Sequence, residues 1–447
     1  MKTNQPSTTF NDIVEDVAKA IPGYRRIIFK IIIIALVIGK GRKRISTVFA
    51  DFSTLIIGTQ ITRRRFYEFL GSPKIKWEEI IKILIQKIGR RILTAGRLIL
   101  VADDSSYGKT GKKISGCQTH FDHASKINSS KWLFGHCRVL VGVLLFIHGR
   151  WACLPFAQKL YLRKKENKEK EKESKGKTTS DNTSKIVIAA DLINGLRRII
   201  PFPTLAACDS WFGTKTLLKA LNIPELPPIH ILSRLRITSA LYAIPEPQRP
   251  GKKGRKRKYG KRLPGLRELA TEYERNTIQV FMYGKERDVT YSEFICVSKA
   301  LQCQIKVVLI HNNKNGTFFP IFTTDLAMSA KDMIEIYSAR WKIESGFKEI
   351  KHEIGALDNQ ARKSYAVENH FNLCCLAATL TWVYAMDQKQ APPRRYPSLR
   401  SPTYSFADVR EQVRNEYLKP INFSGFCPEI VKRAGNLILD QFLRRVA

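Results

Sequence analysis

The chain has 447 residues, which is too long for one compact hydrophobic core and predicts several domains. Its 76 lysines and arginines outnumber 39 aspartates and glutamates, giving a net charge of +37, whereas its hydrophobic content of 44% is ordinary. Such an excess of positive charge repels itself unless a polyanion neutralises it, so we expect DNA or RNA as the partner. Basic ribosomal proteins share this charge balance, but they rarely carry so large an apolar fraction at this length.

Cysteine usage and hydropathy indicate the compartment. Nine cysteines without regular spacing argue for a reducing environment and against a disulfide framework. The apolar run Ile31–Ile38 is too short to span a bilayer and predicts a buried helix. The chain begins with polar and acidic residues, unlike a signal peptide. We therefore expect a cytoplasmic, nucleoid-associated protein with no membrane partner.

Residues 1–95 alternate apolar and basic faces between glycine and proline breaks, which predicts a helical domain. Two basic clusters in it, Gly39–Arg44 and the run of Arg63, Arg64 and Arg65, suggest contacts to a nucleic-acid backbone. Solvated basic loops on a helical bundle explain either cluster equally well when it is taken alone. We interpret this region as a helical DNA-binding domain.

The hydrophobic pattern changes period over residues 96–232 and predicts a mixed α/β sheet. The expected strands are residues 98–102, 139–146, 151–156, 204–208 and 228–232, and the expected helices are residues 186–200 and 215–221. Residues 163–183 are rich in lysine, glutamate and serine with almost nothing apolar, so we expect a flexible charged insertion there.

Residues 233–324 do not continue this alternation and predict a β-rich insertion with strands at 277–283, 289–291, 305–311 and 318–322. Its basic loop, residues 250–262, offers further DNA-binding candidates: Arg255, Lys256, Arg257 and Lys258. Residues 325–390 return to helices, of which 369–386 is apolar enough to pack behind the sheet. A linker and C-terminal helices are expected over residues 391–447.

The stretch from Tyr337 to Lys351 predicts one amphipathic helix, capped by Ser329 with Asp332 and stopped at Gly355. At 100° per residue, one edge of this helix carries a single carboxylate among a phenol and cations. The residues on this edge are Tyr337, Arg340, Glu344, Lys348 and Lys351. Taken alone, the pattern describes an amphipathic helix with a solvated charged edge.

Two other carboxylates follow short apolar strands: Asp103, or its neighbour Asp104, and Asp209. Sites in α/β sheets are built at the carboxyl ends of strands, and clustered carboxylates are stable together mainly around hard cations such as Mg²⁺. A turn or a helix cap accounts better for any one of these aspartates alone. Asp103 and Asp104 would face opposite sides of a continuing strand, so only one can be a ligand.

These motifs resemble those of the DDE transposases of bacterial insertion sequences. The spacing from Tyr337 through Arg340 and Glu344 to Lys351 matches the Tyr-(2)-Arg-(3)-Glu-(6)-Lys signature of one branch. Asp-Asp-Ser at 103–105 and Cys-Asp-Ser-Trp-Phe-Gly at 208–213 are similar to the family's first and second aspartate regions. The resemblance covers roughly residues 98–385 and implies an RNase H-like catalytic core interrupted by a β-rich insertion. We prefer Asp103 to Asp104 because its pattern matches the family better.

The resemblance also implies an activity. Asp103, Asp209 and Glu344 would hold two Mg²⁺ ions, for which Mn²⁺ can substitute, and the enzyme would nick transposon ends and join the freed 3′ ends to target DNA. Tyr337, Arg340 and Lys351, with Lys348 beside them, would hold DNA phosphates. The partners would be double-stranded DNA and a second copy of the chain in a synaptic homodimer. A metal-dependent endonuclease that does not join, and an inactive transposase-derived DNA-binding protein, are the alternatives.

Overall fold

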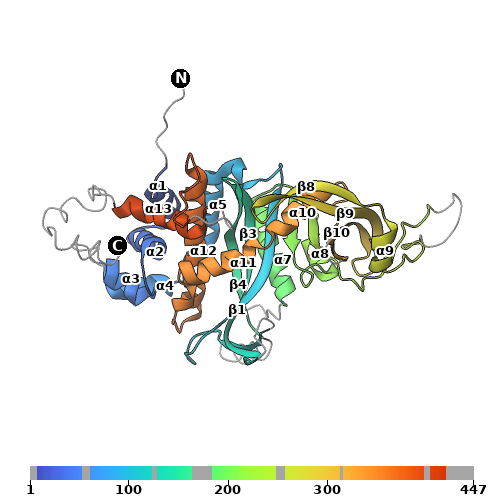
Figure 1. The fold of residues 1–447 in the computed structure, drawn as a ribbon. Helices are drawn as coiled ribbons and strands as arrows, with labels where there is room; N and C mark the ends of the chain where they lie inside the picture. Colours follow the sequence, from blue (N-terminus) through green and yellow to red (C-terminus); the bar gives the residue numbers. More distant parts are fainter. Residues whose placement is uncertain are drawn as a thin grey trace, which may run out of the picture.

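The structure is a computed structural model that describes residues 8–52, 61–122, 128–163, 184–247, 257–312, 316–396 and 403–418. Nearly all of the predicted charged insertion, and Arg255 and Lys256, lie outside these residues. The molecule is elongated, with helices at one end, a large sheet in the middle and a β-rich part at the other end (Figure 1).

The N-terminal region is helical, as its pattern predicted. Its helices are α1 (Phe10–Ala18), α2 (Arg25–Ile38), α3 (Ile45–Phe52), α4 (Arg63–Leu70) and α5 (Trp77–Ile88), followed by the 3₁₀ turn Gly89–Ile92. The apolar run that was too short for a membrane lies in α2, where every residue from Ile31 to Ile38 is buried. These helices pack around α12 (Ser364–Asp387) and share one apolar cluster with the sheet.

One half of the sheet consists of β1 (Leu98–Gly108), β3 (Trp132–Ile147), β4 (Arg150–Tyr161), β5 (Thr204–Cys208) and β6 (Ile229–Arg234), with the short β2 (Gln118–Phe121) beside β3. The strands run in the order β4-β3-β1-β5-β6. Within it, β1 pairs antiparallel with β3 and parallel with β5, and β5 pairs parallel with β6. This mixed α/β sheet is compatible with the expected RNase H-like core.

The β-rich part extends the same sheet beyond β6. Its elements are β7 (Leu241–Tyr242), α9 (Leu266–Glu272), β8 (Asn276–Met282), β9 (Lys285–Ser298), β10 (Cys303–Asn312) and β11 (Thr317–Thr323). Strand β11 joins the two halves because it pairs antiparallel with β6. The four predicted strands are confirmed, although β9 is much longer than expected, and α9 was not predicted.

Helices cover both faces of the sheet (Figure 1). One face carries α7 (Lys185–Ile199) and α8 (Lys215–Leu221), and the other carries α10 (Ala330–Ala339), α11 (Lys342–Lys348) and α12. The predicted apolar helix behind the sheet is α12, which packs on β4 and on α13 (Phe406–Leu418). None of the described helices is both long and apolar enough to cross a membrane.

The single helix predicted through Tyr337–Lys351 is wrong. Helix α10 ends at Ala339, α11 begins at Lys342, and a π-helical turn follows over Glu349–Glu353. The N–H of Glu344 donates to the carbonyl of Trp341 (3.1 Å), which tightens one turn, and that of Ile354 donates to the carbonyl of Glu349 (3.0 Å), which widens the next. The predicted Ser329 cap and the stop at Gly355, whose φ is 93°, are confirmed.

Candidate active site

Asp103 and Asp104 lie within β1 rather than at its end, so the expectation that they close the strand is wrong. The strand continues because the long β3 offers it partners as far as Gly108 opposite Gly135. Adjacent side chains of a strand face opposite sides of the sheet. Accordingly, Lys185 on α7 donates to Asp104 Oδ2 at 2.6 Å, whereas Asp103 faces the turn between α10 and α11.

Asp209 follows directly after β5, as predicted. Its Oδ1 accepts the N–H groups of Trp211 and Phe212, both at 3.0 Å, which holds the turn at the strand end. The turn needs Gly213, because a Cβ there would lie 2.2 Å from the hydroxyl of Ser233 on β6. Within the described part of the chain Asp209 Oδ2 takes no hydrogen bond, so one carboxylate oxygen is free for a ligand.

Arg340 links the strand acid to the helix acid. It occupies the turn between α10 and α11, where its Nη1 lies 3.6 Å from Asp103 Oδ2 and its Nη2 lies 3.5 Å from Glu344 Oε1. The residue is only 8% exposed, and its Nε and Nη1 are buried without a hydrogen-bond partner among the described residues. Buried donors of this kind normally have a hydrogen-bond partner. The guanidinium is therefore placed to donate to a further acceptor.

The acids share one electrostatic environment. Burial raises the pKa of Asp103 from 3.8 to about 7; the negative charge of Asp209 acts in the same direction and the Arg340 guanidinium opposes it. Burial also raises the pKa of Glu344, with Asp209 again contributing and Arg340 opposing. Three carboxylates from distant parts of the chain therefore influence one another, and the positive charge of Arg340 offsets this effect only in part.

The residue types suit a hard divalent cation, because all three side chains offer carboxylate oxygens and two of them are raised in pKa. Among the described residues, however, no three acidic, histidine or cysteine side chains stand close enough together to hold a metal ion as they are. Arg340 supplies the positive charge between Asp103 and Glu344 instead. A metal ion would therefore have to bind beside the guanidinium or displace it from its position between the carboxylates.

The remaining acids near the helix serve the fold. Asp325 pairs with Arg97 at 2.8 Å, and Glu349 accepts the indole N–H of Trp382 at 3.1 Å. Their partners account for these two carboxylates without a metal site.

The other predicted residues of the 337–351 stretch lie around this site. Lys351 Nζ donates to the Ser105 hydroxyl at 2.6 Å, and burial lowers the pKa of this lysine to about 8. The Tyr337 ring packs near Phe319, with 5.8 Å between centroids, and near the guanidinium of Arg340. Lys348 is exposed at the end of α11. Arg340 and Lys351 thus lie against β1, whereas Tyr337 lies against Phe319 of β11.

The more distant basic candidates are not brought to the carboxylates. Arg63 and Arg64 line a groove beside the N-terminal helices, and Arg65 stacks on Tyr24. Arg257 and Lys258 are exposed in the loop before α9. Helix α9 lies at the far end of the β-rich part (Figure 1).

The groove also contains residues that the sequence pattern did not single out: Arg25, Lys74, Arg362 and Lys363. Each is an ordinary surface cation in sequence, and the only signal was the high overall charge.

Comparison with protein families matches residues 21–288 to the DDE superfamily endonuclease family. The matched region contains Asp103 and Asp209. It begins at residue 21, well before residue 98, where the resemblance in the motifs begins. No curated protein matches the chain significantly.

Proposed function

Because the chain belongs to the DDE superfamily of endonucleases, we propose that it is the transposase of a bacterial insertion sequence. Membership in this superfamily implies hydrolysis of phosphodiester bonds in DNA, generally with divalent metals. The observation that carries the narrower proposal is the Arg340 bridge, in which one guanidinium of the Tyr-Arg-Glu-Lys signature contacts both Asp103 and Glu344. Asp209 completes the set through its influence on the pKa of both acids.

In this proposal Asp103, Asp209 and Glu344 hold two Mg²⁺ ions, or Mn²⁺ in their place. When bound, such ions supply an activated water or 3′-hydroxyl and neutralise charge on the leaving oxygen. The protein's own part is to position the DNA. Arg340, whose Nε and Nη1 are buried without a hydrogen-bond partner among the described residues, turns from the carboxylates to the scissile phosphate, where its charge stabilises the transition state.

Two further side chains keep the DNA in register. Lys351 is held on β1 through Ser105, two residues from Asp103, and so presents a charge to a phosphate next to the scissile one. Tyr337 packs beside Arg340 and limits where that side chain can move. Lys348 adds an exposed charge on the same side of the helix. A second copy of the chain, bringing the other end of the element, completes the synaptic complex.

The test is a cleavage and joining assay with Mg²⁺, using the DNA that brackets the reading frame and a supercoiled target plasmid. We expect 3′ ends to be cut and then joined to the target. Cleavage without joined product would leave a metal-dependent endonuclease. Binding without cleavage would leave a DNA-binding protein derived from a transposase. Inverted repeats flanking the gene would support the proposal independently.

Lys351→Ala should weaken DNA binding and lower the slope of log K against log salt by about one phosphate contact, because one ionic contact is lost. Titrations of a fluorescent duplex at several salt concentrations measure both quantities. Lys351→Arg is the matched control, since it retains the charge and should restore the slope. An unchanged slope in the alanine variant would exclude a phosphate contact at this position.

A further inference from the structure

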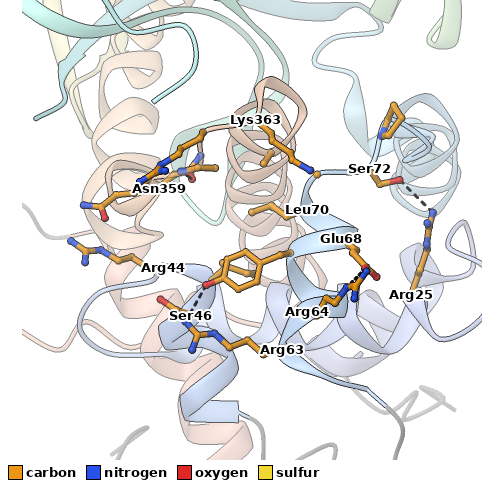
Figure 2. Close-up of a pocket in the computed structure, with 18 of the residues that line it drawn as sticks. Arg25, Arg44, Ser46, Arg63, Arg64, Glu68, Leu70, Ser72, Asn359 and Lys363 are labelled. Carbon is orange, nitrogen blue, oxygen red and sulfur yellow. Dashed lines mark hydrogen bonds and ion pairs between the residues drawn. The ribbon is translucent and has the colours of Figure 1, made fainter. Parts of the chain in front are cut away.

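A basic groove lies between the N-terminal helices and the segment that leads into α12. It has a volume of about 1100 Å³. Its walls come from the starts of α2 and α3 and from α4 with the turn after it on one side, and from residues 359–366 on the other. Figure 2 shows its charged side chains around the hollow, with Arg63 and Arg64 facing Asn359 and Lys363 across it. The groove is thus built from two parts of the chain that are nearly 300 residues apart.

The charge of the groove is one-sided. Its described lining carries one carboxylate, Glu68, which pairs with Arg64 at 2.8 Å. The cations that line it are Arg25, Arg44, Arg63, Arg64, Lys74, Arg362 and Lys363. Arg44 also has a buried Nε without a hydrogen-bond partner among the described residues. Such a cluster is costly unless an anion enters it, so the groove fits a polyanionic ligand.

The backbone adds to this preference. Helix α12 has 24 residues and begins at Ser364, between the lining residues Lys363 and Ala366, without a side chain capping its N-terminus. The start of a long helix presents free N–H groups and a partial positive charge. Together with the cations around it, this helix start favours phosphate groups.

A line of contacts joins the groove to the carboxylates. Beyond Asp103, β1 carries Ser105, which accepts from Lys351, and then Tyr107, whose ring lies 5.4 Å from Lys351 Nζ and 5.5 Å from Lys109 Nζ. Lys109 in turn donates to the carbonyl of Asn359 at 2.8 Å, on the groove wall. Lys109 directly follows β1 and lies six residue steps from Asp103, a distance of about 20 Å.

We propose that this groove holds the phosphate backbone of the duplex whose scissile bond lies at Asp103 of the same protomer. At about 3.4 Å per base pair, the groove contacts the DNA roughly six to eight base pairs from the cut. The N-terminal helices and the catalytic core therefore grip one DNA segment jointly. The position of the contact relative to the cut rests on the proposed function, whereas the DNA contact itself does not.

The contact is tested by replacing Arg362 and Lys363 together with alanine in the full-length protein. Binding of a 30-base-pair duplex in EDTA should weaken by roughly tenfold near 0.1 M salt, and the salt slope should fall by about two phosphate contacts. The matched control is Arg198→Ala with Lys219→Ala, which removes two exposed cations from α7 and α8 on the opposite face of the sheet. Equal losses of DNA affinity in both double variants would overturn the proposed contact in the groove, since only the net charge of the protein would then matter.

The position is tested by hydroxyl-radical footprinting on DNA cut at the end of the element. We expect protection near the cut and again roughly six to eight nucleotides away, and loss of the second region alone in the Arg362→Ala/Lys363→Ala variant. Protection that survives in this variant would overturn the proposed placement. If the wild-type protein cuts no DNA, the proposed function fails, yet the EDTA binding comparison still decides whether the groove holds DNA.

Discussion

Cleavage of element ends by a Glu344→Gln variant is expected to fall by about a thousandfold or more. Glutamine has the shape of glutamate but lacks the negative charge that binds a divalent cation. The stabilisation that such ions give to a phosphodiester transition state is several kcal/mol, and each factor of ten in rate corresponds to about 1.4 kcal/mol. Single-turnover cleavage with Mg²⁺ measures the loss.

The same variant should fold and bind DNA like the wild type. Burial already raises the pKa of Glu344, so a neutral side chain is tolerated at that position, and Arg340 retains its contact with Asp103. Glu335→Gln is the matched control: Glu335 lies on α10 and accepts the N–H of Phe281, which glutamine can also do. Cleavage by Glu344→Gln at the rate of Glu335→Gln would exclude Glu344 as a metal ligand.

The elements that sequence predicted best are those in which one pattern had one interpretation. The apolar run at Thr204–Cys208 and the helix Lys215–Leu221 match β5 and α8 at both ends, because a turn signal bounds each of them. Asp209 was located correctly for the same reason. Tertiary partners decided the other boundaries: β1 runs past its acids into Ser105 and Ser106 only because β3 lies alongside.

The helix of the signature shows the limit of periodicity. A spacing of 3.6 residues is satisfied by one straight helix. It is also satisfied by two short helices when the rotation lost in a tightened turn is nearly compensated by a widened turn. No glycine or proline marks the break at Arg340, and nothing in the sequence marks the π-helical turn after Lys348. Such turns are frequent at functional sites, and this one leads directly to Lys351.

Basic clusters were the least informative feature of the sequence. Lys43 belongs to the predicted cluster Gly39–Arg44, yet it is buried and donates to the carbonyls of Leu36 and Glu353. Its neighbour Arg44 lines the groove. The sequence alone does not distinguish a buried cation that donates to carbonyls, such as Lys43, from a groove-lining cation, such as Arg44. The distinction depends on which carbonyls the fold brings within reach.

The choice between Asp103 and Asp104 leads to the second large effect. Asp103→Asn should lower the cleavage rate by about a thousandfold, as expected for Glu344→Gln, because the variant loses the negative charge of a metal ligand. Asp104→Asn should retain most of the activity, since Asp104 faces α7 and pairs there with Lys185. Cleavage rates of the two variants, measured side by side, decide which aspartate the chemistry uses. The reverse ranking would transfer the ligand role to Asp104.

Stability provides a readout of Asp103 that does not depend on catalysis. In the folded protein the pKa of Asp103 is about 7, whereas an unfolded aspartate titrates near 3.8, so the folded state resists ionisation of this group. The metal-free wild type should therefore lose stability as the pH rises from about 4 to 7, while Asp103→Asn lacks this loss. We expect Asp103→Asn to have a higher Tm than the wild type in EDTA at pH 8, and the difference to vanish near pH 4.

Added Mg²⁺ should stabilise the wild type at pH 8 more than the variant, because the ion compensates the charges of Asp103 and Asp209. A Tm of Asp103→Asn at or below that of the wild type at pH 8 would mean that Arg340 alone already balances the charge of Asp103, leaving no electrostatic demand for a metal ion there.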